Sequence, residues 1–145
     1  MENNFEIKQN IFYRAEDLLD KMNGFFSAGE NFPLVVSGNS MSPFLFDKRD
    51  SVLLSCPNRE IKPGDICLYY RNTRLILHRV VKKIGKDLYF CGDAQEQLEG
   101  PISSDEVIAV VISVFREKKT VKADSIVWKY YKNRASLRRL YKKIK

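Results

Sequence analysis

The first part of the chain shows the spacing of an amphipathic helix. Between residues 7 and 26 the apolar positions recur in steps of three and four, at Ile7, Ile11, Phe12, Ala15, Leu18, Leu19, Met22, Phe25 and Phe26. This period predicts a helix with one apolar face. The stretch SAGENF interrupts the pattern at Gly29. We therefore expect an N-terminal helix within residues 1–30.

The pattern changes between residues 32 and 116, where short apolar or alternating runs recur. These runs are FPLVV, DSVLLS, DICLYY, RLILHRVV, DLYFCG and VIAVVISVF. They are rich in β-branched and aromatic residues, and turn-forming stretches such as DKRD, RNT and IGKD separate them. The sequence thus predicts a mainly β fold, with a compact antiparallel β body over residues 31–117. At 145 residues the whole chain suits a single domain.

The last part of the chain returns to helical spacing and is strongly basic. Residues 118–145 carry eleven Lys or Arg and one acidic residue, Asp124, so their net charge is +10 and residues 1–117 carry −3 of the total of +7. We expect a basic amphipathic C-terminal helix over 118–145. Its aromatic and basic residues favour an anionic membrane surface as partner. A solvated or packed helix is the alternative, and the absence of a recognised DNA-binding motif argues against nucleic acid.

The composition narrows the chemistry. Three cysteines without a CxxC spacing argue against a disulfide framework or a zinc site, and a single histidine argues against a His-rich metal centre. We expect no metal or other cofactor. The polar, acidic N-terminus does not resemble a signal peptide, and no apolar run approaches the roughly 18 residues of a membrane span. We therefore expect a cytoplasmic protein, with the basic segment as its means of reaching the inner face of the membrane.

The stretch SGNSMSP at residues 37–43 contains a candidate nucleophile. A serine hydroxyl is a weak nucleophile until a base takes its proton. The only histidine of the chain is His78, which follows three apolar residues in RLILHRVV. A neutral imidazole, with an ordinary pKa of about 6.5, accepts a proton at physiological pH. Ser40 and His78 are therefore a candidate nucleophile and base, and the alternative is a turn serine and a core histidine.

Four short motifs occur in an order that resembles the signal-peptidase-I and LexA/UmuD group of serine peptidases. They are SGNSMSP at 37–43, PGD at 63–65, HRVV at 78–81 and CGDA at 91–94. The histidine in HRV is similar to the Ser-His branch, which contains the endoplasmic-reticulum, archaeal and sporulation-type signal peptidases. The resemblance covers roughly residues 32–114. It implies the β fold of that group, with Ser40 as nucleophile and His78 as base. Typical members carry a membrane anchor, for which this sequence offers no candidate segment.

The resemblance also implies an acid shortly after the GD motif. The family's run of aspartates is absent from GDAQEQLEGPISSDE, which offers Asp93, Glu96, Glu99 and Asp105. Glu99 stands nearest the expected place, and Asp93 is the second candidate for a triad acid. Gly38, Asn39 and Met41 are candidates for oxyanion or substrate binding, together with the N–H of Ser40.

The function implied by the resemblance is a serine endopeptidase that processes a leader, signal or precursor peptide through an acyl-enzyme on Ser40. Related enzymes bind the peptide as an extended strand and prefer small residues before the cleaved bond. Two other functions stay open. One is LexA/UmuD-like self-cleavage, for which SAGENF offers the Ala28–Gly29 bond. The other is a non-catalytic peptide-binding module on the same fold.

Overall fold

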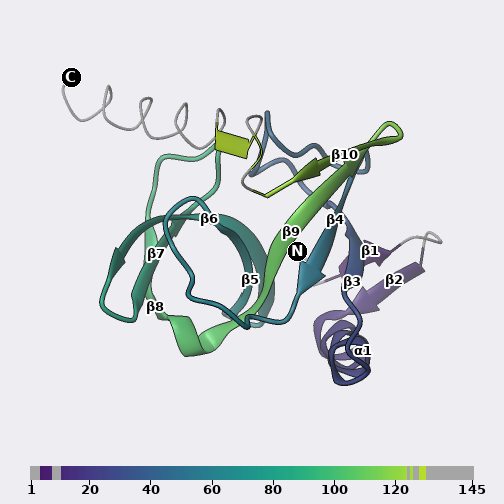
Figure 1. The fold of residues 1–145 in the computed structure, drawn as a ribbon, viewed down its shortest axis with the longest axis horizontal. Coiled ribbons are helices and arrows are strands. Elements are labelled where there is room, and N and C mark those ends of the chain that lie inside the picture. The colour runs from purple at the N-terminus through teal and green to yellow at the C-terminus, as the bar shows by residue number, and fades with distance from the viewer. Residues whose placement is uncertain (1–3, 8–10, 124, 126–127, 130–145) are drawn as a thin grey trace.

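A single antiparallel sheet forms most of the molecule. In this computed structural model, which describes residues 4–7, 11–123, 125 and 128–129, eight strands pair in the order β3-β4-β9-β5-β6-β7-β8, with β10 attached to β9. The strands are β3 Phe32–Val35, β4 Asp50–Ser55, β5 Ile66–Arg71, β6 Arg74–Ile84, β7 Asp87–Cys91, β8 Glu99–Ser103, β9 Val107–Arg116 and β10 Lys119–Lys122. The predicted mainly antiparallel β fold is confirmed. In Figure 1, β5 to β8 curve around one side and β3, β4 and β9 form the other.

The N-terminal segment contains a short hairpin and one helix. Strands β1 Asn4–Ile7 and β2 Ile11–Arg14 pair antiparallel, and helix α1 follows at Ala15–Ser27. The predicted helix is confirmed, but its predicted start was wrong, because residues 11–14 pair with β1 and leave the helix to begin at Ala15. Two acidic residues, Glu16 and Asp17, occupy its first turn, where their negative charges interact favourably with the positive end of the helix dipole.

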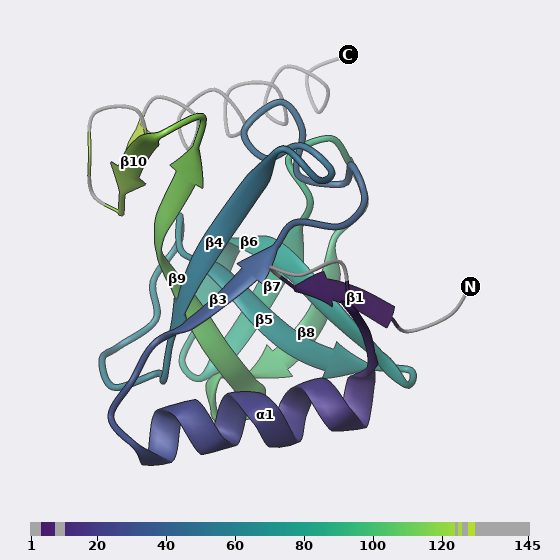
Figure 2. The same ribbon diagram turned by 90° about the vertical axis from the view of Figure 1, so that its right-hand side faces the viewer.

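Two groups of buried side chains hold the sheet together. Helix α1 runs below the sheet in Figure 2 and buries Ala15, Leu18 and Met22 against residues of β3, β4 and β9. A second group lies among the strands on the other side, where Tyr69, Phe90 and their neighbours from β5 to β9 pack together. Burial of this apolar surface provides the main stabilisation of both halves.

Two strands arise where the sequence predicted other structure. Strand β8 lies in GDAQEQLEGPISSDE, outside the six apolar runs that predicted strands, and it pairs with β7 with Leu88 and Ile102 facing each other. Strand β10 lies in the segment assigned to the basic helix, so that prediction was wrong for residues 119–122. The turn residues Glu117 and Lys118 have positive φ angles of 46° and 68°, which fold the chain back onto β9. Residues 130–145, the rest of the predicted basic helix, lie outside the described residues.

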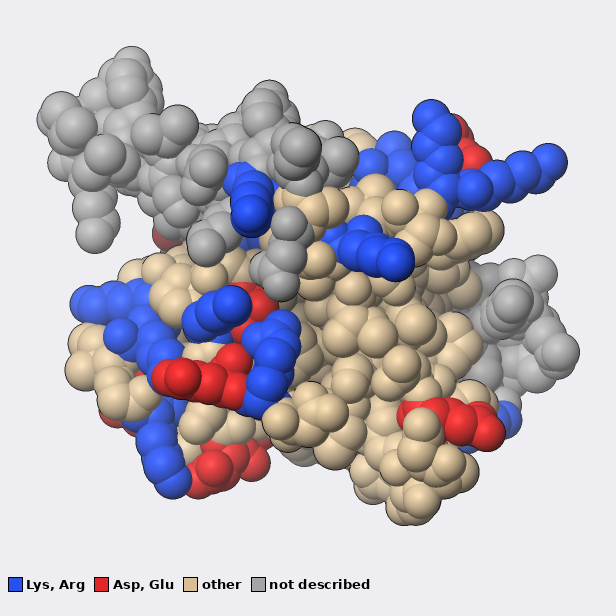
Figure 3. All heavy atoms as spheres, in the orientation of Figure 1, with Lys and Arg blue, Asp and Glu red and all other residues tan. Residues whose placement is uncertain are grey.

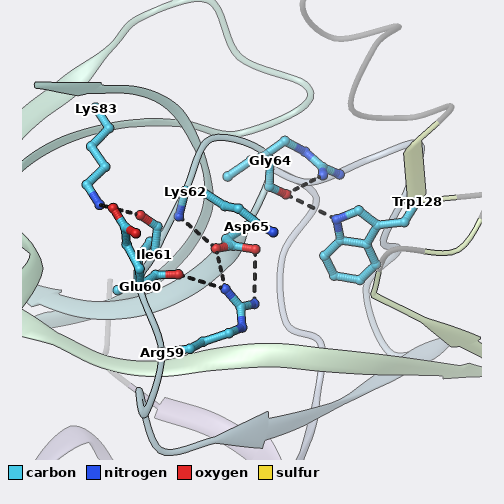
Figure 4. A network of polar contacts seen from close by, with 9 residues as sticks. Arg59, Glu60, Ile61, Lys62, Gly64, Asp65, Lys83 and Trp128 are labelled. Atoms are coloured by element: carbon cyan, nitrogen blue, oxygen red, sulfur yellow. Dashed lines mark hydrogen bonds and ion pairs between the residues drawn. The ribbon is translucent and has the colours of Figure 1, made fainter.

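The chain returns to the β body at Trp128. Its indole is buried, packs edge-on against Phe44 with ring centroids 5.1 Å apart, and donates a hydrogen bond from Nε1 to the carbonyl of Gly64 at 3.1 Å (Figure 4). The adjacent Asp65 accepts two hydrogen bonds from the Arg59 guanidinium at 2.9 and 3.1 Å. The PGD motif is therefore a fixed turn to which the end of the described chain is attached.

Charge is unevenly distributed over the described surface. In Figure 3, Lys and Arg side chains gather at the end of the β9–β10 hairpin with few acidic atoms among them, and the lower left of the view shows a mixture of both signs. Within the described residues, no helix is long and apolar enough to cross a bilayer.

Candidate active site

Ser40 and His78 meet although they are 38 positions apart in the chain. Ser40 lies in the loop that joins β3 to β4, and His78 lies in the middle of β6. The Oγ of Ser40 is 3.2 Å from Nε2 of His78, which is hydrogen-bonding distance. The structure therefore brings the two residues singled out by the sequence into a nucleophile–base arrangement.

The dyad lies in an open cleft of about 1150 Å³. One wall is the segment 36–41, the second is the start of β6 with the preceding turn, and the third is the segment 95–100. All three contain residues that the sequence nominated. A cleft of this volume lies within or just above the range of ligand-binding pockets in proteins.

The second nitrogen of His78 faces a tyrosine. Its Nδ1 is 3.4 Å from the hydroxyl oxygen of Tyr69, and that hydroxyl donates a hydrogen bond to Glu99 Oε1 at 2.5 Å. The other oxygen of Glu99 is 3.8 Å from Nε of Arg71. Burial lowers the pKa of His78 from its ordinary value of 6.5, while the charges of Glu99 and Asp93 act in the opposite direction. The imidazole is therefore neutral at physiological pH, as a general base must be.

Asp93 is bound by Arg79 and not by His78. Its two carboxylate oxygens accept hydrogen bonds from Nε and Nη2 of Arg79 at 2.8 and 2.9 Å, and both side chains are buried. The same guanidinium donates to the carbonyl of Gly64 at 3.0 Å. Of the two leading acid candidates, only Glu99 is linked to His78, and the link runs through Tyr69.

The remaining acid candidates are both exposed. Glu96 is exposed on the wall of the cleft. Asp105 is exposed in the short 3₁₀ turn Ser104–Glu106 and lies 3.5 Å from Nζ of Lys86. Asp105 has no contact with His78 among the hydrogen bonds and ion pairs of the described residues.

The loop before Ser40 fixes the candidate oxyanion donors. The N–H of Gly38 donates to Oδ1 of Asp47 at 2.7 Å, so this predicted donor already has an acceptor. Oδ1 of Asn39 accepts from the N–H of Asp47 at 3.4 Å, which leaves the NH₂ of the Asn39 amide without a partner among the described residues. The N–H of Ser40 likewise has none there. Both groups are donors that the loop leaves available to an oxyanion.

The segment after β7 contacts the backbone of Ser40. Its carbonyl accepts a hydrogen bond from the N–H of Ala94 at 2.9 Å. Gly92 lies so close that a Cβ at that position would be 2.5 Å from the same carbonyl oxygen. Met41, the next residue, is buried and lines the cleft. The segment that follows β7 therefore positions Ser40, which explains why a glycine is needed in the CGDA motif.

Half of β6 has an unpaired edge next to the dyad. Strand β7 pairs with β6 only from Arg79 to Ile84, so within the described part of the chain residues 74–78 have a partner strand, β5, on one side only. The turn between β5 and β6 has positive φ at both central residues, Asn72 and Thr73 (52° and 64°), the geometry of a two-residue type I′ hairpin. In such a hairpin, hydrogen-bonded and non-hydrogen-bonded pairs alternate. Leu75 and Leu77 consequently direct their backbone N–H and C=O groups away from β5, along the open edge.

The Ala28–Gly29 bond is engaged elsewhere. It forms the C-terminal cap of α1, where the N–H of Gly29 donates to the carbonyl of Phe26 at 3.0 Å. Neither residue lines the cleft that contains Ser40. The structure therefore does not bring this bond and the candidate nucleophile together.

Tyr69 is the site residue that sequence reasoning missed. Its run, DICLYY, reads as a buried strand, and nothing in the run distinguishes one tyrosine from a core aromatic. The available signal was the two-residue turn at Asn72 and Thr73. This turn sets the register of the hairpin, in which Tyr69 pairs with Ile76 and thus lies diagonally across from His78.

In comparisons with known proteins, the sequence matches no family model and no curated protein sequence. The function is therefore argued from the residues and contacts of the cleft.

Proposed function

We propose that the protein is a serine endopeptidase of the signal-peptidase-like kind, with Ser40 as nucleophile and His78 as general base. The observation that carries the proposal is the 3.2 Å contact between Ser40 Oγ and Nε2 of the only histidine in the chain. The motif order that resembles the Ser-His branch of signal peptidases supports it independently, since the resemblance nominates the same two residues.

The proposed reaction has two stages. Nε2 of His78 takes the hydroxyl proton as Ser40 Oγ attacks the peptide carbonyl, and the imidazolium returns this proton to the nitrogen of the leaving amine when the C–N bond breaks. Water then attacks the acyl-enzyme with His78 again as base, which releases the acid product and restores the hydroxyl. The N–H of Ser40 and the side-chain amide of Asn39 stabilise the oxyanion in each stage.

The substrate of this proposal is a peptide bound in extended form. The outward N–H and C=O groups of Leu75 and Leu77 offer hydrogen bonds to one more antiparallel or parallel strand. A peptide paired there runs along the same cleft wall that ends at His78. Leader, signal or precursor segments fit this requirement, because an unfolded segment can pair with a strand edge along its backbone.

An activated ester tests the proposal without knowledge of the natural substrate. Incubation with p-nitrophenyl acetate is expected to release p-nitrophenolate in a burst and to add one acetyl group, located on Ser40 by peptide mapping. Ser40→Ala should abolish the burst, and His78→Ala should slow it by about a hundredfold or more. Acetylation that persists unchanged in both variants would remove Ser40 and His78 from the proposed roles.

A further inference from the structure

We propose that Tyr69 is a positioning residue for His78. Its hydroxyl oxygen accepts a hydrogen bond from the Nδ1–H of the imidazole, and its O–H donates a hydrogen bond to Glu99. The carboxylate thus orients the imidazole through the tyrosine hydroxyl. This inference rests on the proposed function for its catalytic consequence. The geometry on which it depends is a chain of contacts from Ser40 to His78, Tyr69 and Glu99 that no single sequence motif contains.

The direction of each hydrogen bond follows from the groups that meet. A carboxylate can only accept, and the phenol has one proton, so the 2.5 Å contact places the Tyr69 proton toward Glu99 Oε1. The phenol oxygen then has only lone pairs left for the ring nitrogen 3.4 Å away. Nδ1 of His78 must therefore be the protonated nitrogen. Nε2 is left with its lone pair directed at Ser40 Oγ, as proton abstraction requires.

Packing holds the phenol in place. Tyr69 is completely buried in β5, between β6 and β9, and its ring packs against Phe90 with centroids 4.3 Å apart. Burial, followed by the hydrogen bond to Glu99, raises the pKa of the Tyr69 hydroxyl above its ordinary value of 10.0. The phenol therefore keeps its proton over the whole working range of the enzyme and remains a donor to Glu99.

A purely structural tyrosine would have different consequences. If the ring serves only to fill the core, removal of the hydroxyl affects stability and leaves the imidazole unchanged. If the hydroxyl sets the tautomer, its removal leaves Nδ1–H without an acceptor, and removal of Glu99 frees the phenol proton to turn toward Nδ1. Once Glu99 is removed and the phenol donates to Nδ1, Nε2 would become the protonated nitrogen and could no longer take the Ser40 proton.

The single histidine makes the test direct. Protein labelled with nitrogen-15 histidine and produced without a histidine tag gives imidazole signals from His78 alone. Above pH 7 the wild type is expected to show the tautomer with a protonated Nδ1 and a bare Nε2. Glu99→Leu is expected to reverse it, whereas Glu99→Gln, whose amide oxygen still accepts from the phenol, is expected to retain it. A wild-type spectrum with protonated Nε2, or a Glu99→Leu spectrum identical to wild type, would overturn the proposal.

The kinetic readout uses the p-nitrophenyl acetate burst. Tyr69→Phe should slow acylation of Ser40 by about tenfold to a hundredfold, and Glu99→Leu by at least as much. Tyr70→Phe, on the same strand with an exposed ring, and Asp87→Asn, an exposed carboxylate on β7, are the matched controls and should react at the wild-type rate. A Tyr69→Phe variant that is folded and acylates as fast as Tyr70→Phe contradicts the positioning role.

The two proposals fail in different ways. If Ser40 is not acetylated in the wild type, the proposed function fails, while the tautomer still reports whether Tyr69 orients the imidazole. If Ser40 is acetylated but the tautomer of His78 is unchanged by substitution of Tyr69 and Glu99, the positioning role fails and the peptidase proposal stands.

Discussion

Arg79 and Asp93 form a buried ion pair directly behind the dyad. Two hydrogen bonds of 2.8 and 2.9 Å join the guanidinium to the carboxylate, and the guanidinium carbon lies 5.2 Å from the ring centre of Phe44 and 5.7 Å from that of Trp128. Arg79 follows His78 on β6, and Asp93 precedes Ala94, whose N–H holds the carbonyl of Ser40. The pair therefore connects the strand that carries His78 to the segment that supports Ser40.

Removal of one member of this pair should be strongly destabilising. Arg79→Met leaves the Asp93 carboxylate buried without a counter-charge, which costs about 3–5 kcal/mol of unfolding free energy. Urea denaturation followed by circular dichroism measures the change. The matched control is Lys86→Met, which removes an exposed pair with Asp105 and should change stability by less than about 1 kcal/mol. Equal losses in the two variants would show that the buried pair has no special importance.

Gly92→Ala should impair the nucleophile more than the fold. The added Cβ would lie 2.5 Å from the carbonyl oxygen of Ser40, so the serine backbone must move. Displacements of about 1 Å in an active site can cost about a hundredfold in rate, and we expect at least a tenfold slower acetylation by p-nitrophenyl acetate. Gly24→Ala is the matched control, because no atom lies within 4 Å of its new Cβ. It should leave the rate unchanged and add about 0.5–1 kcal/mol of stability to helix α1. A wild-type rate in Gly92→Ala would contradict the close support of Ser40.

The acylation rate should fall at acid pH with the protonation of His78. Because burial lowers the pKa of His78, the inflection of the rate–pH curve is expected below 6.5, the ordinary value. The charge of Glu99 raises this pKa, so Glu99→Gln should shift the inflection to still lower pH. The free energy of unfolding should also fall at acid pH, because His78 binds a proton more readily in the unfolded chain than in the folded protein. The contribution of neutral His78 to stability is complete above pH 6.5 and is lost as the pH falls through the lowered pKa of the folded state. An inflection that moves upward in Glu99→Gln would refute the assignment.

The open edge of β6 should favour substrates with a peptide backbone. The p-nitrophenyl ester of acetyl-trialanine is expected to acylate the enzyme faster than p-nitrophenyl acetate, since its backbone can pair with Leu75 and Leu77. Leu77→Pro removes an N–H that points away from β5 and should reduce this preference by about tenfold, the equivalent of one hydrogen bond.

Two variants separate this effect from side-chain packing and from unfolding. Leu77→Ala shortens the side chain but keeps the N–H, so the preference for the peptide ester should persist. Ile76→Pro removes an N–H that pairs with β5 and should instead disrupt the sheet. The edge hypothesis fails if Leu77→Pro is folded and prefers the peptide ester as strongly as Leu77→Ala does.

The sequence predicted the strands better than it predicted their surroundings. Each of the six apolar runs forms a strand, because a half-buried or buried strand needs β-branched and aromatic residues at regular positions. Strand β8 was missed because its sequence, EGPIS, has a single β-branched residue, Ile102, which faces Leu88 of β7 only in the folded sheet. Ser40 and His78 could be nominated from short motifs. That they meet depends on the sheet order, which places β5 between β9 and β6 and follows from no local pattern.

The choice between Asp93 and Glu99 illustrates the same limit. Both carboxylates follow the GD motif, and their spacing does not show which one is connected to His78. The decisive residue is Arg79, which is buried and needs a counter-charge, and it takes both oxygens of Asp93. Glu99 reaches the base because β8 pairs with β7, which brings it next to the Tyr69 hydroxyl. Neither partner can be inferred without the folded sheet.

The unpaired half of β6 also bears on the solubility of the protein. A free strand edge is a template for edge-to-edge association between copies, and proteins commonly protect such edges by keeping them short or charged. Here β7 covers the second half of the strand, and two arginines, Arg71 and Arg74, flank the turn that begins the open half. Like charges would approach each other if two such edges met near their ends. The arginines can thus oppose association of two such edges, and substitution of both by apolar residues would remove that protection.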